Sequence, residues 1–146
     1  MDAGQDSAKG PWDPVASVPR GLYVDGRWID GSGEIEVVNP ADGSVVIRVA
    51  NGTADHARAA LDAAARAQGE WGRLAPRRRA DLLHAAHRLL REREATIVTA
   101  MTLESGKPLT EARAEFLLSA DFLLWFAEQA AHLHGTYATS SQGGFR

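Results

Sequence analysis

Short apolar runs separated by turn residues fill the chain between residues 20 and 50. Two such runs flank Asp25-Gly26, a pair that favours a two-residue type I′ hairpin turn because both positions need positive φ. Residues 34–38 alternate polar and apolar side chains, and residues 45–49 are rich in β-branched residues. The pattern predicts four short strands arranged as two hairpins over residues 20–50.

Apolar side chains recur at intervals of three and four residues beyond Gly52, and alanine is concentrated there, which favours helix. Thr53 is suited to an N-cap, Pro76 to a first helical turn, and Gly69, Gly106 and Gly135 to positions just after a helix. The predicted helices run from Thr53 to about Gln68, from Pro76 to about Arg93, from there to Gly106, and from Leu109 to about His134. The pattern leaves open whether the second and third are continuous near Glu94.

The last predicted helix is apolar on more than one side. One stripe consists of Ala112, Phe116, Ala120, Leu123, Ala127 and Ala130. Leucine, phenylalanine and tryptophan cover much of the remaining surface, including Leu118, Phe122 and Trp125. A helix of this kind needs to be covered on several sides.

The chain ends differ in composition from the middle. Residues 1–19 are polar and contain three prolines, which predicts a mobile tail, and residues 136–146 form a second polar tail. The expected fold is therefore α+β, with hairpins in residues 20–50 and helices in residues 53–135 of one unit, 20–146. No run resembles a secretory signal or a membrane span, so we expect a cytoplasmic protein that does not enter a membrane.

Composition narrows the chemistry available to these residues. The 146 residues contain no cysteine, which excludes disulfides, zinc–thiolate sites and a cysteine nucleophile among them. The net charge of −3 argues against nucleic-acid binding by the chain as a whole. Arg73–Arg93 is locally basic, with seven arginines and two acidic residues. This segment leaves nucleic-acid binding as a minor alternative to a solvated or intersubunit face.

Two further patterns are similar to a metal-binding and a phosphate-binding motif, but each lacks a residue that the motif requires. His84 and His87 are three residues apart on a predicted helix, but no His-Glu-x-x-His arrangement or third ligand accompanies them. Ser105-Gly106-Lys107 is similar to the end of a phosphate-binding loop, yet Pro108 stands where serine or threonine is needed. The residues by themselves show no catalytic constellation.

Several segments, taken together, resemble the start of an aldehyde dehydrogenase over about residues 21–135. The segments share their order and spacing with that family: Tyr23-Val24-Asp25-Gly26-Arg27-Trp28, Val38-Asn39-Pro40-Ala41-Asp42-Gly43, Arg77–Leu83 after Trp71, and Leu103-Glu104-Ser105-Gly106-Lys107-Pro108-Leu109. Glu111-Ala112-Arg113 and Trp125-Phe126-Ala127-Glu128 resemble the succinate-semialdehyde dehydrogenase branch in particular. The resemblance implies a truncated, incomplete N-terminal part of the aldehyde dehydrogenase α/β fold.

The resemblance also implies a function for the complete enzyme. That function is oxidation of a semialdehyde-like aldehyde to a carboxylic acid with NAD or NADP, in a homo-oligomer. The family's nucleophilic cysteine, oxyanion asparagine, general-base glutamate and cofactor site all come after the matched region. We therefore expect no catalytic or cofactor-binding residue in this chain, no activity or NAD(P) binding by it alone, and self-association or aggregation in isolation.

Four residues are assigned a role by the resemblance alone. Leu118 and Phe122 correspond to positions that border the aldehyde entrance tunnel, and Glu104 with the backbone of Val38 corresponds to a monovalent cation site. Core packing and a carboxylate at a helix terminus are the structural alternatives. A non-enzymatic helical module that binds a partner through the last helix is the alternative function, and nucleic-acid binding through Arg73–Arg93 is a weaker one.

Overall fold

The computed structural model describes residues 13–132, which form two small antiparallel sheets and four α-helices. The elements follow one another in this order: η1, a 3₁₀ helix (Asp13–Ser17), β1 (Leu22–Val24), β2 (Arg27–Ile29), β3 (Glu34–Val38), β4 (Val45–Ala50), α1 (Ala54–Arg73), α2 (Pro76–Glu92), α3 (Glu94–Ser105) and α4 (Leu109–Ala130). The predicted order of hairpins and then helices is confirmed. Among these described helices, none is long and apolar enough to cross a membrane.

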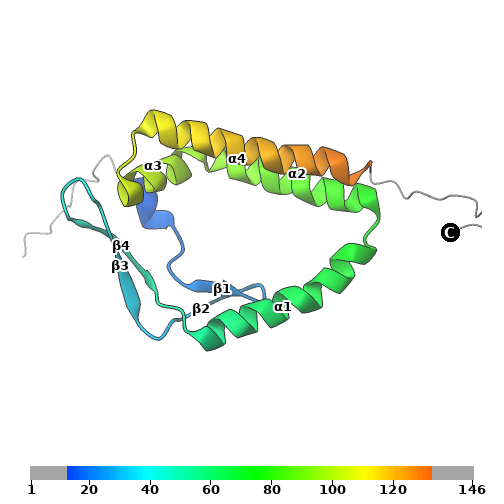
Figure 1. Cartoon of the computed structure of the whole chain (residues 1–146), viewed down its shortest axis with the longest axis horizontal. Coiled ribbons are helices and arrows are strands. Elements are labelled where there is room, and N and C mark those ends of the chain that lie inside the picture. Colours follow the sequence, from blue (N-terminus) through cyan, green and yellow to red (C-terminus); the bar gives the residue numbers. More distant parts are fainter. Residues whose placement is uncertain (1–12, 133–146) are drawn as a thin grey trace, which may run out of the picture.

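The elements form an open frame (Figure 1). Helices α2 and α4 lie side by side and run in opposite directions, and α3 packs at one end of the pair. Helix α1 runs apart from them along the other side of the frame, next to the β1–β2 hairpin. The β3–β4 hairpin and η1 lie at the end of the frame where α3 packs.

The two hairpins form around tight turns and pair their strands in the antiparallel direction. Asp25 has φ 52° and Gly26 has φ 75°, as the predicted two-residue turn requires. The side chains of Tyr23 and Trp28 pair across β1 and β2, with ring centroids 5.0 Å apart. Strands β3 and β4 pair in the same antiparallel way, with an irregularity between Val37 and Val38.

The turn between β3 and β4 is held by side chains that bond to their own backbone. Asn39 Oδ1 accepts a hydrogen bond from the amide of Ala41 at 3.0 Å. Asp42 Oδ1 accepts from both the Oγ and the amide of Ser44, at 2.6 and 2.9 Å. These two bonds favour the ionised form and hold the pKa of Asp42 below its ordinary value.

The helix boundaries agree with the sequence at most caps and differ at two, the ends of α1 and α4. Thr53 caps α1 and Pro76 begins α2, as predicted. Helix α1 does not stop near Gln68 but continues through Gly69 to Arg73. A glycine inside a helix costs about 1 kcal/mol, which is too little to end it, whereas the residue before a proline is kept out of helical geometry. The stop therefore comes at Leu74-Ala75, directly before Pro76.

Helices α2 and α3 are separated by a single residue, which resolves the continuity that the pattern left open. Arg93 has φ −102° and ψ 11°, and helix resumes at Glu94. The Glu94 carboxylate bonds Arg91 at 3.3 Å and Arg113 at 2.8 Å, so it links both sides of this elbow to α4. The guanidinium of Arg91 also lies 5.9 Å from the centre of the Phe116 ring.

The main core lies where α4 meets α2 and α3. Ala112, Phe116 and Val98 form one buried cluster, with Leu90, Ile97, Met101 and Leu117 packed against it. The buried residues of α4 are Ala112, Phe116, Ala120, Ala127 and Ala130. They match the predicted stripe, apart from Leu123, which is half-buried. Alanine at these positions lets the helix backbones approach closely.

Of the two predicted tails, the structure describes only residues 13–19 of the first. The sequence predicts no packed element in residues 1–19, whereas Asp13–Ser17 form η1, which packs on α3 and buries the side chain of Val15. The burial of Val15 against α3 and β4 is a tertiary contact that the composition of this segment does not reveal. Helix α4 ends at Ala130, with Ala131 as its cap, so the predicted end near His134 is too late by about four residues. Gly135 and the 136–146 tail lie outside the described residues.

Gly106 provides a test of the junction between α3 and the β3–β4 turn. It ends α3 with φ 73°, and a Cβ there would lie 2.8 Å from Cγ of Pro40. We predict that Gly106→Ala lowers the free energy of unfolding by about 1–2 kcal/mol from the backbone conformation alone, and further through the contact with Pro40. Urea denaturation followed by circular dichroism measures the change.

Gly72→Ala is the matched control, because a Cβ at Gly72 meets no atom within 4 Å and its backbone is helical. It should leave stability unchanged or raise it by up to about 1 kcal/mol. Equal effects of the two substitutions would contradict the assigned role of Gly106.

Candidate functional site

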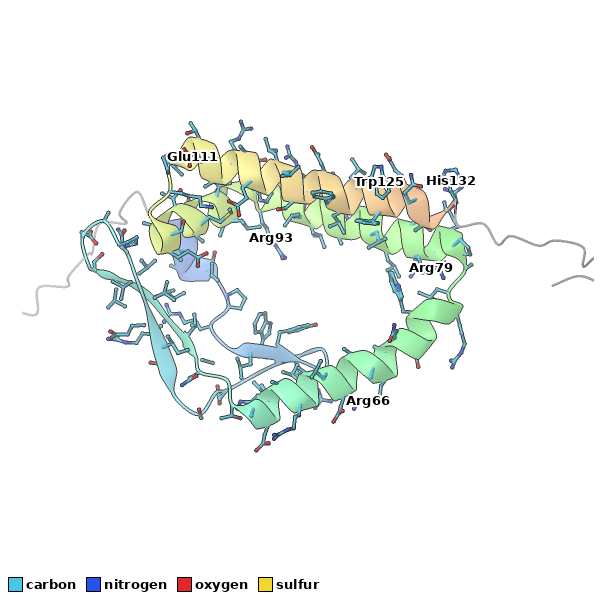
Figure 2. The ribbon with its side chains drawn as sticks, in the orientation of Figure 1. Arg66, Arg79, Arg93, Glu111, Trp125 and His132 are labelled. Carbon is cyan, nitrogen blue, oxygen red and sulfur yellow. The ribbon has the colours of Figure 1, made fainter. Side chains whose placement is uncertain are left out.

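The outer face of α4 carries the largest exposed apolar side chains of that helix. Leu118 and Phe122 are each 59% exposed, and Trp125 and Phe126 are slightly less so. The last two rings meet edge to face, with centroids 5.0 Å apart and an interplanar angle of 86°. Figure 2 shows Trp125 on the second half of α4.

These four side chains and Asp121 line one open hollow of about 310 Å³. We call it the outer α4 hollow. It brings Leu118 and Phe122 together, as their spacing of four residues on a helix requires. Asp121 is the one charged residue in its lining, and sequence reasoning did not single it out. The hollow can accept an apolar group, and its lining offers no pair of nucleophile and base. A role of Leu118 and Phe122 in an aldehyde tunnel stays a prediction.

The two segments assigned to a monovalent cation also meet in space. Pro40, just after β3, lies against Gly106 at the end of α3. Val38 and Glu104 lie two residues before Pro40 and Gly106 respectively, and both are exposed. Within residues 13–132, no three side chains of the ligating types gather closely enough to hold a metal ion. The assignment of Glu104 and Val38 to a cation stays a prediction.

A second hollow, of about 300 Å³, opens beside this junction. Its lining combines apolar residues of η1 and α3 with Arg20, Asn39, Asp42 and Ser44. The oxygens of Asn39 and Asp42 already accept the turn hydrogen bonds described above. These polar groups thus stabilise the turn.

The two histidines singled out from the sequence do not form a site. His84 is exposed and His87 is half-buried on α2. In the described part of the chain, no further Asp, Glu or His completes a metal-binding group with them.

The basic segment Arg73–Arg93 is partly neutralised by contacts within the chain. Arg79 Nη1 donates to the carbonyls of Leu74 at 2.8 Å and Gly72 at 3.3 Å, where α1 meets α2 (Figure 2). Arg88 pairs with Glu92 at 3.0 Å, and Arg91 pairs with Glu94. These contacts favour a structural role for the segment over nucleic-acid binding.

A family model for the aldehyde dehydrogenase family matches residues 28–145. The chain belongs to the aldehyde dehydrogenase family. It is 41% identical over 114 residues to an NADP⁺ succinate-semialdehyde dehydrogenase of Escherichia coli, covering 77% of this chain and 24% of that protein. It is 38% identical over 115 residues to a glutarate-semialdehyde dehydrogenase of Pseudomonas aeruginosa, with the same two coverages.

The structure agrees with this membership. It superimposes on a crystal structure of betaine aldehyde dehydrogenase from Staphylococcus aureus in complex with NAD⁺ with a TM-score of 0.83 and 25% identity, covering 89% of this chain and 27% of that one. The chain thus spans about a quarter of the length of the aldehyde dehydrogenases it matches. The predicted N-terminal part of the aldehyde dehydrogenase fold is confirmed.

The two faces of α4 differ enough to be separated by matched substitutions. Phe116 is 3% exposed, whereas Phe122, on the same helix, lies on the outer hollow. We predict that Phe116→Ala costs about 3–5 kcal/mol of unfolding free energy, because it empties the core. Phe122→Ala should change it by about 0.5 kcal/mol or less. Chemical denaturation of both variants checks this, and a large loss for Phe122→Ala would show that the outer face is covered.

Proposed function

We propose that these residues are the N-terminal part of an NAD(P)-dependent aldehyde dehydrogenase that oxidises a semialdehyde to a carboxylic acid. The observation that carries the proposal is the identity of 41% and 38% to two semialdehyde dehydrogenases from different bacteria. Because the chain spans about a quarter of those relatives, the activity belongs to an enzyme that also contains the remaining elements of the fold. The cofactor of that enzyme is NAD or NADP.

In this proposal the described residues shape the site without reacting. Leu118 and Phe122 border the route of the aldehyde, supported by their shared position in the outer α4 hollow. Glu104 and the backbone of Val38 hold a monovalent cation, supported by the packing of Pro40 against Gly106. In these roles Leu118 and Phe122 supply apolar groups, and Glu104 supplies a charged group, at the edge of the reaction centre.

In this proposal the cofactor is held outside the described residues. Both sheets in this part of the chain are two-stranded and antiparallel, whereas the Rossmann type of dinucleotide site is built on a parallel βαβ unit with a glycine-rich turn. The family's chemistry also needs a thiolate nucleophile, and these 146 residues contain no cysteine. We therefore assign no residue here to the cofactor or to covalent catalysis.

The purified 146-residue chain should not oxidise succinate semialdehyde with either NAD⁺ or NADP⁺. The assay follows formation of the reduced cofactor, with the full-length E. coli relative as the positive control. Turnover by the chain above the rate of a blank would overturn the proposed division of roles.

A chimera tests the activity itself. Residues 21–135 replace the corresponding segment of the E. coli relative, which supplies the rest of the enzyme. We expect NADP⁺-dependent oxidation of succinate semialdehyde to persist. A chimera that folds, by circular dichroism and size exclusion, but oxidises no semialdehyde would contradict the proposal.

The exposed apolar face of α4 favours one further candidate function, which is partner binding. Contiguous exposed apolar surface marks an interface or a tendency to aggregate. Four large side chains of this kind, Leu118, Phe122, Trp125 and Phe126, line one hollow. Burial of this face against another polypeptide would remove its apolar side chains from water, as burial within a complete enzyme would.

The isolated chain should therefore self-associate as its concentration rises, as measured by light scattering. Replacing Phe122 and Phe126 with serine should reduce the association, because it removes apolar area from the hollow. Leu61→Ser, which alters an exposed leucine on α1, serves as the control and should leave it unchanged. A monomer at all concentrations would argue against an uncovered interface on α4.

A further inference from the structure

Helix α1 is held to the rest of the molecule by few contacts. Ala63 is its one buried residue within the described chain, and its main packing partner is β1. Midway along, Arg66 lies 3.4 Å from Asp25 in the β1–β2 turn. At its C-terminal end, Arg79 binds the carbonyls of Leu74 and Gly72. The start of α1 is fixed locally by its N-terminal capping box, in which Thr53 and His56 bond each other.

The cap of α1 uses an imidazole where a carboxylate or amide is usual. Thr53 Oγ1 accepts a hydrogen bond from the amide of His56 at 3.3 Å. In return, the amide of Thr53 donates to Nδ1 of His56 at 3.1 Å. In the common form of this capping box the third residue of the helix is glutamate or glutamine, whose oxygen accepts at neutral pH. An imidazole nitrogen accepts only while it carries no proton.

We propose that His56 makes the capping box of α1 sensitive to pH, with both hydrogen bonds present at neutral pH and the bond from the Thr53 amide to His56 lost in mild acid. Protonation places a hydrogen on Nδ1, which then faces the Thr53 amide as a second donor, and the hydrogen bond is lost. It also adds positive charge at a helix N-terminus, where the peptide dipoles disfavour it. Both effects act in the same direction.

The sign of the pH dependence follows from which form of the imidazole caps the helix. The neutral form accepts the bond, so this bond contributes stability while the imidazole is neutral. This contribution is lost as the pH falls and the imidazole takes up a proton. The charged groups of the contact between α1 and the β1–β2 hairpin are Asp25 and Arg66, which lie 3.4 Å apart.

The surroundings of His56 offer no replacement for the lost bond. His56 lines a hollow of about 340 Å³ between β1 and the start of α1. The β1 residues of its lining are Leu22, Tyr23 and Val24, none of which is acidic. On α1 itself, the carboxylate of Asp55 already bonds Arg58 at 2.5 Å. A protonated imidazole therefore gains no free carboxylate from this lining.

Loss of the bond from the Thr53 amide to His56 would act on the contact between α1 and β1. The first turn of α1 supplies Thr53, His56 and Ala57 to the wall of the hollow. When this bond is lost, Thr53 Oγ1 still accepts from the His56 amide, so the first turn keeps one of its two capping bonds. The predicted result is a local loosening at the first turn of α1 in mild acid, while the core between α2 and α4 is unaffected.

Hydrogen exchange measured by NMR on the 146-residue chain tests the proposal. Protection factors, which correct for intrinsic exchange, are compared at about pH 7.5 and about pH 5.5, on either side of the histidine range. We expect the protection of the Thr53 amide to fall roughly threefold to tenfold at the lower pH, as loss of one cap predicts. The amide of Ala120, in the core of α4, is the internal reference and should not change.

The matched variant is His56→Gln, whose side-chain oxygen accepts at both pH values. Its Thr53 amide should be protected equally at both, whereas His56→Ala should show low protection at both. Equal protection of Thr53 in the native chain at the two pH values would overturn the proposal. A fall of the same size in His56→Gln would overturn it as well, because the fall would then originate in another group.

Discussion

Helix α4 has more apolar surface than the described residues cover, and this constraint shapes the molecule. Its inner stripe is built from alanines and Phe116, which lets α2 and α3 pack closely against it. Its outer face keeps Phe122 and Trp125 in contact with solvent. Because one helix presents apolar surface on two sides, it can serve as both a core element and a contact surface. In Figure 1, α2, α3 and α4 therefore pack together along one side of the frame, and α1 lies apart from them along the other.

Polar contacts join the helices both at the packed junction of α2, α3 and α4 and between α1 and α2. Glu94 links two arginines across the α2–α3 elbow, and Arg79 links α2 to the last carbonyls of α1. Exposed ion pairs contribute little stability individually, commonly about 0–1 kcal/mol. Their effect here is geometric: Glu94 holds the angle at the packed junction of α2, α3 and α4, whereas Arg79 joins α2 to α1, with which it has little other contact.

Local rules predicted the features that depend on neighbouring residues. Asp25-Gly26, Thr53, Pro76 and Gly106 mark turns and helix ends because their backbone preferences act within a few residues. The helix pattern likewise placed Leu118 and Phe122 on one face. The extension of α1 past Gly69 was missed because a weak local penalty competes with the gain from continuing the helix. The contact of Pro40 with Gly106 joins residues far apart in sequence, and no local pattern could reveal it.

The contact of Pro40 with Gly106 also gives a physical reason for part of the resemblance to aldehyde dehydrogenases. Two of the segments that resemble aldehyde dehydrogenases, around Asn39-Pro40 and Gly106-Lys107-Pro108, pack against each other. The lack of a side chain at Gly106 is what lets Pro40 approach, so this part of the resemblance records a packing requirement. Fold and chemistry are separable, and a packing motif is shared by relatives with different substrates. The contact of Pro40 with Gly106 therefore identifies the fold rather than the aldehyde that an enzyme with this fold oxidises.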